Sequence, residues 1–302
     1  MEEPNWHIDK SELLNYIRAQ WGGIDAFLAC EPTFLDNAPT IIRVELNLYR
    51  AYLLRERFHR RLAKSIRRSL IYPNILDFNG SLAIDGYICI NEFLPSEMLR
   101  HVQIAMISSL LSEDKSERTW HCRNDPDSAN TARGSSFTNM PTYIEQPISQ
   151  EIRKIIERHL YIRPEEQVHV LRCLHIHYSN DRDTQFHMDN YGAPTLKWFY
   201  FPFGTSNCDQ GFMFCQGSHT MNSRNADYIR EISPFNLRRC ELQRRIPPNE
   251  IGLVANDIKH FNKENSLVIA DTSAFHARSI ATDGMLRVTI QGGLDSKVLV
   301  HE

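Results

Sequence analysis

The sequence lacks several features by which large classes of protein are recognised. It has no CxxC pair, and its seven cysteines are scattered along 302 residues. This usage argues against a disulfide scaffold and is typical of reduced thiols in a cytosolic protein. No apolar stretch approaches the ~20 residues that cross a bilayer, and the acidic first residues do not resemble a secretory signal. We therefore expect a cytoplasmic protein.

An excess of charge of one sign is also missing. The 34 Lys and Arg residues against 37 Asp and Glu residues give a formal net charge of −3 with histidine neutral. A general nucleic-acid-binding protein normally carries a clear basic excess, so nucleic acid is not an expected partner. Hydrophobic residues at 42% and charged residues at 24% are typical of a globular chain. The composition leaves the oligomeric state open.

The strongest helical pattern lies at residues 41–70, where apolar side chains recur at helical spacing between many arginines. The pattern predicts an amphipathic, strongly basic helix. One interpretation is that this helix packs on the core and exposes its basic face to solvent. The other is that the basic face contacts an anionic membrane surface or an acidic partner. The protein would then lie peripherally at the inner membrane surface.

Strand patterns dominate the second half of the chain, from about residue 168. Together with turn residues between them, they predict a barrel or jelly roll with helices packed outside it, in a single domain over 1–302. Residues 1–75 would form a helical N-terminal extension. Polar residues 121–142 predict a long loop, a candidate lid. Helices are expected at 97–111 and 148–160, and strands at 87–90, 168–178, 196–203, 211–215, 250–255, 266–270 and 286–291.

His187 and Asp189 form the first part of a candidate metal site. In an extended segment residues i and i+2 point to the same face, so the imidazole and the carboxylate can bind one metal ion. His276, directly after the apolar strand at 266–270, supplies a third ligand. Two histidines and one carboxylate on one side of a metal are typical of non-haem Fe(II) oxygenases, whose open positions take a co-substrate and O₂. Such an iron retains positive charge, which suits an anionic 2-oxo acid.

Arg287 follows eleven residues after His276, in the predicted strand at 286–291. Strand periodicity places Arg287, Thr289 and Gln291 on one face. An arginine that points into a small barrel needs a partner, because a buried unpaired charge costs about 3–5 kcal/mol. The far carboxylate of a dicarboxylic co-substrate would pair with its guanidinium in bidentate fashion. Thr289 could hydrogen-bond the same carboxylate.

Four segments resemble the phytanoyl-CoA dioxygenase-like branch of the Fe(II)- and 2-oxoglutarate-dependent oxygenases, over about residues 78–295. They are DGYICI at 85–90, FHMDN at 186–190, GFMFCQGSH at 211–219, and the pair His276 and Arg287. The resemblance implies a mainly β core with flanking α-helices, folded as a double-stranded β-helix (jelly roll, cupin-like). It also implies Fe(II), 2-oxoglutarate and O₂, and hydroxylation of an unactivated C–H bond with release of succinate and CO₂. Related halogenases lack the carboxylate ligand; Asp189 is present here, which argues against halogenation.

The remaining site residues are predicted from their places beside these motifs. Tyr178 and Lys197 are expected to contact the co-substrate. Four residues are candidates for the substrate pocket: Arg172, Asn190, Trp198 and Gln291. Trp198 has core packing as an equally good interpretation, and Arg172 has an exterior ion pair. The substrate is expected to be a small organic molecule, such as a natural-product intermediate, an amino acid or an acyl group.

Three other functions stay open at this point. The basic helix at 41–70 allows an enzyme that hydroxylates a lipid-linked sugar or lipid head group at a membrane surface. The barrel could also be a non-catalytic binding module. The same three metal ligands could serve a zinc hydrolase, although a hydrolase has no need of Arg287 for a dicarboxylate.

Overall fold

A computed structural model of the chain describes two antiparallel sheets with helices on either side. It covers residues 4–29, 38–69, 82, 84–111, 119–123, 132–137, 146, 148–152, 154–155, 173–177, 186–189, 196–204, 211–220, 226–227, 257–279 and 287–293. For residues 29, 40, 58–69, 109–111, 119–123, 132–137, 173–177 and 287–288 it describes the backbone alone.

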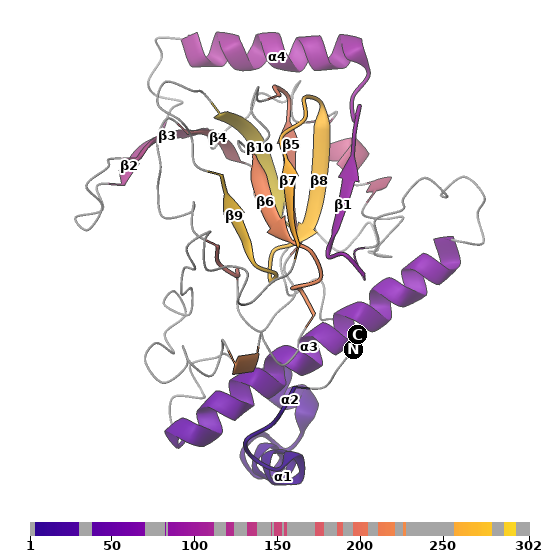
Figure 1. Cartoon of the computed structure of the whole chain (residues 1–302), viewed down its shortest axis with the longest axis vertical. Coiled ribbons are helices and arrows are strands. Elements are labelled where there is room, and N and C mark those ends of the chain that lie inside the picture. The colour runs from indigo at the N-terminus through magenta and orange to yellow at the C-terminus, as the bar shows by residue number, and fades with distance from the viewer. Residues whose placement is uncertain are drawn as a thin grey trace.

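The N-terminal region consists of three helices. They are α1 (Lys10–Trp21), α2 (Ile24–Ala29) and α3 (Thr40–Ser69). Asp9 caps α1, because its carboxylate accepts the backbone N–H of Ser11 at 2.8 Å. The apolar faces of the three helices pack together around Phe27 and Tyr49. The helix predicted at 41–70 is confirmed as α3, which runs obliquely past one end of the sheets (Figure 1).

The larger sheet has seven antiparallel strands in the order β1-β8-β5-β10-β4-β3-β2. Their bounds are β1 (Tyr87–Ile90), β2 (Thr119–Arg123), β3 (Ala132–Phe137), β4 (Cys173–His177), β5 (Leu196–Phe201), β8 (Ser266–Asp271) and β10 (Arg287–Gly293). Strands predicted near residues 87, 196, 266 and 286 are confirmed. The strand predicted at 168–178 is confirmed at its described residues, which form β4.

A smaller sheet packs on one face of the larger one, in front of it in Figure 1. Its strands, in the order β7-β6-β9, are β6 (Phe212–Cys215), β7 (Ile258–Phe261) and β9 (His276–Arg278). Phenylalanines fill the space between the sheets, among them Phe199, Phe214 and Phe261. The predicted mainly β core with flanking helices is confirmed. β6 was expected, β7 and β9 were not, and the strand predicted at 250–255 lies outside the described residues.

Helix α4 (Ser96–Leu111) lies across one end of the sheets in Figure 1 and packs on the face of the larger sheet that is turned away from the smaller one. Its apolar side chains Val102 and Met106 pack in one cluster with Trp198 and Ile269 of the sheet. Complete burial of an apolar side chain of this size contributes about 2 kcal/mol. The helix predicted at 97–111 is therefore confirmed, and it fixes which face of the sheet is turned away from the smaller sheet.

A buried asparagine joins the start of α4 to the sheet. Asn265 has a positive φ of 55°, and its side chain bonds both backbone groups of Leu94: Oδ1 accepts the N–H at 3.0 Å and Nδ2 donates to the carbonyl at 2.8 Å. The hydroxyl of Tyr200 donates to the same Oδ1 at 3.0 Å. Three buried polar groups thus depend on one side chain.

The prediction of a long loop at 121–142 is wrong for part of that range. Residues 132–137 form β3, and residues 119–123 form β2, which pairs with it as the edge of the larger sheet. β3 also pairs with β4. Polar sequence does not prevent strand formation at a sheet edge, where one side can face water. A lid in this region would have to come from residues outside the two strands.

In the part of α3 that ends at Arg57, three arginine side chains bond to other parts of the molecule. Arg50 donates to the carbonyl of Leu28 at 3.0 Å, and Arg57 forms an ion pair with Asp25. Arg55 is buried and donates to the carbonyl of Ser273, in the turn between β8 and β9. These contacts support the packing interpretation of the basic helix as far as Arg57. Among the helices of the described residues, none is both long and apolar enough to cross a membrane.

Candidate metal centre

The backbone brings the two predicted histidine ligands together. His187 and His276 form an isolated antiparallel bridge in which each backbone N–H donates to the carbonyl of the other at 2.9 Å. His276 begins β9, which pairs with β6. Two residues on, the N–H of Asp189 donates to the carbonyl of Thr272 at 2.8 Å. The segments 187–189 and 272–276 therefore hold each other through the backbone.

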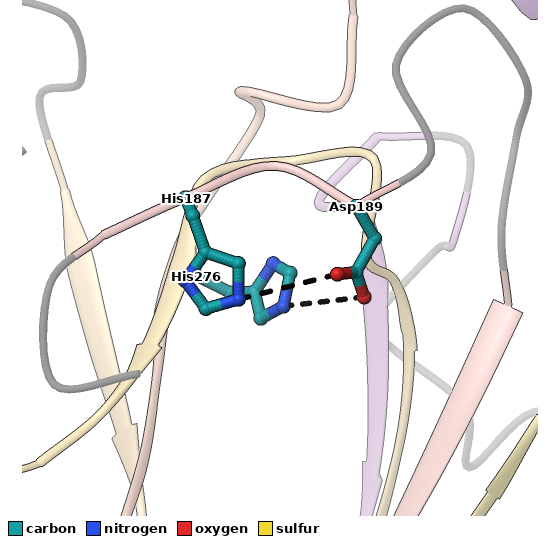
Figure 2. Close-up of side chains that lie close together, drawn as sticks. All are labelled: His187, Asp189 and His276. Atoms are coloured by element: carbon teal, nitrogen blue, oxygen red, sulfur yellow. Dashed lines mark ion pairs between the residues drawn. The ribbon is translucent and has the colours of Figure 1, made fainter. Parts of the chain in front are cut away.

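The three side chains converge on one small volume, as Figure 2 shows. One donor atom from each of His187, Asp189 and His276 lies within 4.8 Å of the other two. Nε2 of His276 is 3.5 Å from Oδ2 of Asp189, and Nε2 of His187 is 4.0 Å from Oδ1. The three side chains are only 7–13% exposed. The grouping predicted from HxD and the distant histidine is present in the fold.

A backbone carbonyl sets the orientation of the His276 ring. Nδ1 lies 2.9 Å from the carbonyl oxygen of Ala274, and because that oxygen can only accept, Nδ1 carries the proton. In the neutral imidazole Nε2 is then the acceptor, and it faces Asp189. A proton on Nε2 would form an ion pair with Asp189. A metal ion is the other cation that satisfies both groups, since metal binding displaces that proton.

Asp189 is held in its ionised form. Burial would by itself raise the pKa of this carboxyl, but the protonated form of His276 and the Lys197 ammonium lower it, and the net pKa lies well below the ordinary value for aspartate. Nζ of Lys197 is 2.5 Å from Oδ2 of Asp189. Lys197 was predicted to contact a co-substrate; the structure places its ammonium on a ligand carboxylate. The HxD spacing gave no signal for this contact, because Lys197 lies on another strand.

Residues 271–276, which we call the ligand turn, are fixed by a dense set of hydrogen bonds. Within the turn, Oδ1 of Asp271 accepts the N–H of Ser273 at 3.0 Å. The N–H of Phe275 donates to Oγ of Ser218 at 3.0 Å, and the Phe275 carbonyl accepts the N–H of Cys215 at 2.9 Å. Ser218 belongs to the GSH motif noted in the sequence. That motif, which directly follows β6, therefore helps to hold the ligand turn in place.

The DGY motif, residues 85–87, also contacts the ligand turn. The carbonyl of Gly86 accepts the N–H of Asp271 at 2.8 Å, and Gly86 has φ of +84°. A Cβ at this residue would lie 2.6 Å from Nδ1 of His219, so only glycine fits. His219 is fully buried beside it. Two motifs separated by about 130 residues in the sequence thus pack together behind the ligand turn, and neither donates a ligand.

The strand register places further predicted residues on the face between the sheets. Lys197 is opposite Gly293 of β10, and Phe199 is opposite Gln291, so these positions share a face. Thr289, two residues from Gln291, is on that face by alternation and is buried. Gln291 is partly buried. The backbone of Arg287 begins β10 opposite His177; its side chain is outside the described part.

Trp198, one of the predicted substrate-pocket residues, is packed in the core. It alternates with Lys197 and lies on the opposite face, in the cluster that packs against α4. Its indole Nε1 has no hydrogen-bond partner among the described residues. Core packing is therefore the role that the structure gives to Trp198. Three other predicted site residues, Tyr178, Arg172 and Asn190, lie outside the described residues.

No protein-family model matches the sequence, and no curated protein matches it. Among solved structures, the chain superposes on the epimerase SnoN, in complex with Fe³⁺, α-ketoglutarate and nogalamycin RO, with TM-score 0.45 and 12% identity over 71% of this chain and 80% of SnoN.

Two further solved structures give similar values. A prolyl hydroxylase from Trichoplax adhaerens, bound to a hypoxia inducible factor peptide, has TM-score 0.42 and 14% identity, covering 80% of this chain and 96% of the hydroxylase. HygX from Streptomyces hygroscopicus, with nickel and 2-oxoglutarate, has TM-score 0.41 and 10% identity, covering 70% and 83%.

Proposed function

We propose that the protein is an Fe(II)- and 2-oxoglutarate-dependent dioxygenase. The observation that supports this most directly is the donor set of His187, Asp189 and His276, with all three donor atoms within 4.8 Å of one another. Two imidazole nitrogens and one carboxylate oxygen suit Fe(II), and three protein ligands leave positions for other molecules. The ring of His276 is already oriented by the Ala274 carbonyl, as metal-ligating histidines usually are.

The proposed contacts of the co-substrate lie on the face of the larger sheet that is turned toward the smaller sheet. Thr289 is buried on this face, and strand alternation leads us to expect Arg287 beside it, where the guanidinium would pair with the far carboxylate of 2-oxoglutarate. Lys197 and Tyr178 are proposed as further co-substrate contacts. When bound, Fe(II) with 2-oxoglutarate and O₂ supplies the oxidising power that hydroxylates a C–H bond, with succinate and CO₂ as co-products.

The proposed substrate is a small organic molecule, such as a natural-product intermediate, an amino acid or an acyl group. We assign Gln291, with Arg172 and Asn190, to its pocket. Gln291 is partly buried between the sheets, and an amide there can hydrogen-bond a polar substrate group. The proposed fold is a double-stranded β-helix of the phytanoyl-CoA dioxygenase-like type, in one domain with residues 1–75 as an extension. Its support is the pair of facing antiparallel sheets and the motifs that meet behind the ligand turn.

An anaerobic optical titration tests the proposal. Protein loaded with Fe(II) should develop a weak visible charge-transfer band on addition of 2-oxoglutarate, because the co-substrate chelates the metal. The variants His187→Ala and Asp189→Ala should lose the band and turnover, whereas Arg287→Ala should keep the band and require more 2-oxoglutarate. His260→Ala is the matched control, since His260 is an exposed histidine of β7 and lies outside the donor set.

The titration also separates the alternatives. Metal binding without any spectral response to 2-oxoglutarate would refute the oxygenase and favour a zinc hydrolase. No metal binding at all would favour a non-catalytic binding module.

A further inference from the structure

We infer that Arg55, in the N-terminal helix α3, is a positioning residue of the metal centre. The inference rests on the proposed metal site, because Arg55 acts on the ligand turn and not on the metal itself. Arg55 is 2% exposed. Its Nη2 donates to the carbonyl of Ser273 at 2.7 Å, across 218 residues of sequence.

The carbonyl that Arg55 binds lies at the middle of the ligand turn. On one side of it the Thr272 carbonyl accepts the N–H of Asp189 at 2.8 Å. On the other side the Ala274 carbonyl accepts Nδ1–H of His276 at 2.9 Å. A shift of the peptide at Ser273 would therefore move the acceptors that orient two of the three metal ligands.

A guanidinium is well suited to this role. A hydrogen bond from a charged donor is among the stronger ones in proteins, and the planar group holds its acceptor in a fixed direction. Burial of a charge is costly, and an apolar side chain of similar length would fill the same space without desolvating a charge. Among its effects, the guanidinium fixes the position of the Ser273 carbonyl. The ligand turn is thus held from outside the region that resembles the oxygenases.

Equilibrium titration with Co(II) tests the inference without any need for turnover, because the visible bands of Co(II) report both affinity and ligand geometry. Arg55→Met should weaken Co(II) binding by about tenfold, the lower end of the effect of residues that support metal ligands, and should shift the bands. The matched control is Arg50→Met. Arg50 is on the same helix and also donates to a backbone carbonyl, that of Leu28 at 3.0 Å, but that carbonyl belongs to the N-terminal helices. The control should leave Co(II) affinity within about twofold of the unaltered protein.

A conservative replacement separates positioning from general stability. Arg55→Lys keeps a cation and a donor, so it should recover most of the Co(II) affinity and the original bands. A merely structural role predicts lower thermal stability with unchanged affinity and bands. Arg55→Met protein that folds and binds Co(II) as the unaltered protein does would overturn the inference.

A measurement on the unaltered protein covers the case in which Arg55→Met does not fold. Coupling between two sites is reciprocal, so bound Co(II) should slow amide hydrogen exchange in α3 around Arg55 as well as in the ligand turn, and not in α1. Slower exchange in the ligand turn alone would overturn the inference while leaving the metal site intact. Failure of the unaltered protein to bind Co(II) would instead refute the metal site, and the role of Arg55 with it.

Discussion

Lys197→Met is expected to have opposite effects on the metal and on the co-substrate. The Lys197 ammonium lies 2.5 Å from Oδ2 of Asp189, so it competes with a metal ion for the same carboxylate. Removal of the ammonium should therefore strengthen metal binding. If the same ammonium also contacts 2-oxoglutarate, as proposed, its loss should weaken binding of this dianion. Methionine keeps an unbranched apolar chain of nearly the same length and removes the ammonium with its charge and its hydrogen-bond donors.

The size of the first effect follows from exposure. The Lys197 side chain is 37% exposed, so solvent screens the ion pair, and a pair of this kind contributes about 1 kcal/mol or less. Loss of that competition corresponds to an increase in metal affinity of at most about fivefold. The matched control is Lys259→Met. Lys259 is 38% exposed and pairs with Asp257 at 2.7 Å, but Asp257 is outside the donor set.

Two titrations on each variant decide the question: Co(II) into the metal-free protein, followed by 2-oxoglutarate into the Co(II)-loaded protein. We expect tighter Co(II) and weaker 2-oxoglutarate binding for Lys197→Met alone. Weaker Co(II) binding by this variant would refute the competition argument, and would mean that Lys197 holds the carboxylate in its ligating orientation.

Two further predictions concern the support of the site. Asn265→Ala should lower the free energy of unfolding by about 3 kcal/mol or more, because three buried polar groups lose their partner at ~1–3 kcal/mol each; urea denaturation measures this, and a loss below ~1 kcal/mol would contradict it. Gly211→Ala should be destabilising by about 3 kcal/mol, because the new Cβ would lie 1.9 Å from the carbonyl oxygen of Phe261. Gly23→Ala, whose Cβ would have no atom within 4 Å, is its control in the same thermal melt; equal melting temperatures would contradict the steric argument.

Hydrophobic periodicity predicted the elements that are buried at every residue or along one regular face. β8 is buried at every residue and reads as an apolar run, and α3 has an apolar stripe at helical spacing. β2 and β3 were missed because their polar residues resemble a loop, and only pairing with β4 shows that they extend the sheet. β9 is three residues long, too short for any periodicity to appear.

The metal ligands could be predicted from the sequence, but the side chains that hold them in place could not. His187 and Asp189 are two residues apart, and strand geometry alone places them on one side. The contacts of Lys197 with Asp189 and of Arg55 with Ser273 depend on the register of strands and on the docking of a helix. Neither leaves a local pattern. Trp198 shows the same limit, since alternation separates the two faces of a strand without saying which one faces the smaller sheet.

The backbone pairing of His187 with His276 affects how far the fold depends on the bound metal. Each histidine makes two main-chain hydrogen bonds to the other, so contacts other than metal ligation also join the two chain segments. In a zinc finger the metal assembles the fold, and a chelator unfolds the domain. Here backbone hydrogen bonds contribute to joining the two segments, so we expect the fold to depend less on the metal. Chelation should leave a folded protein that can be reloaded, and the ion it carries would then depend on which metal the surroundings supply.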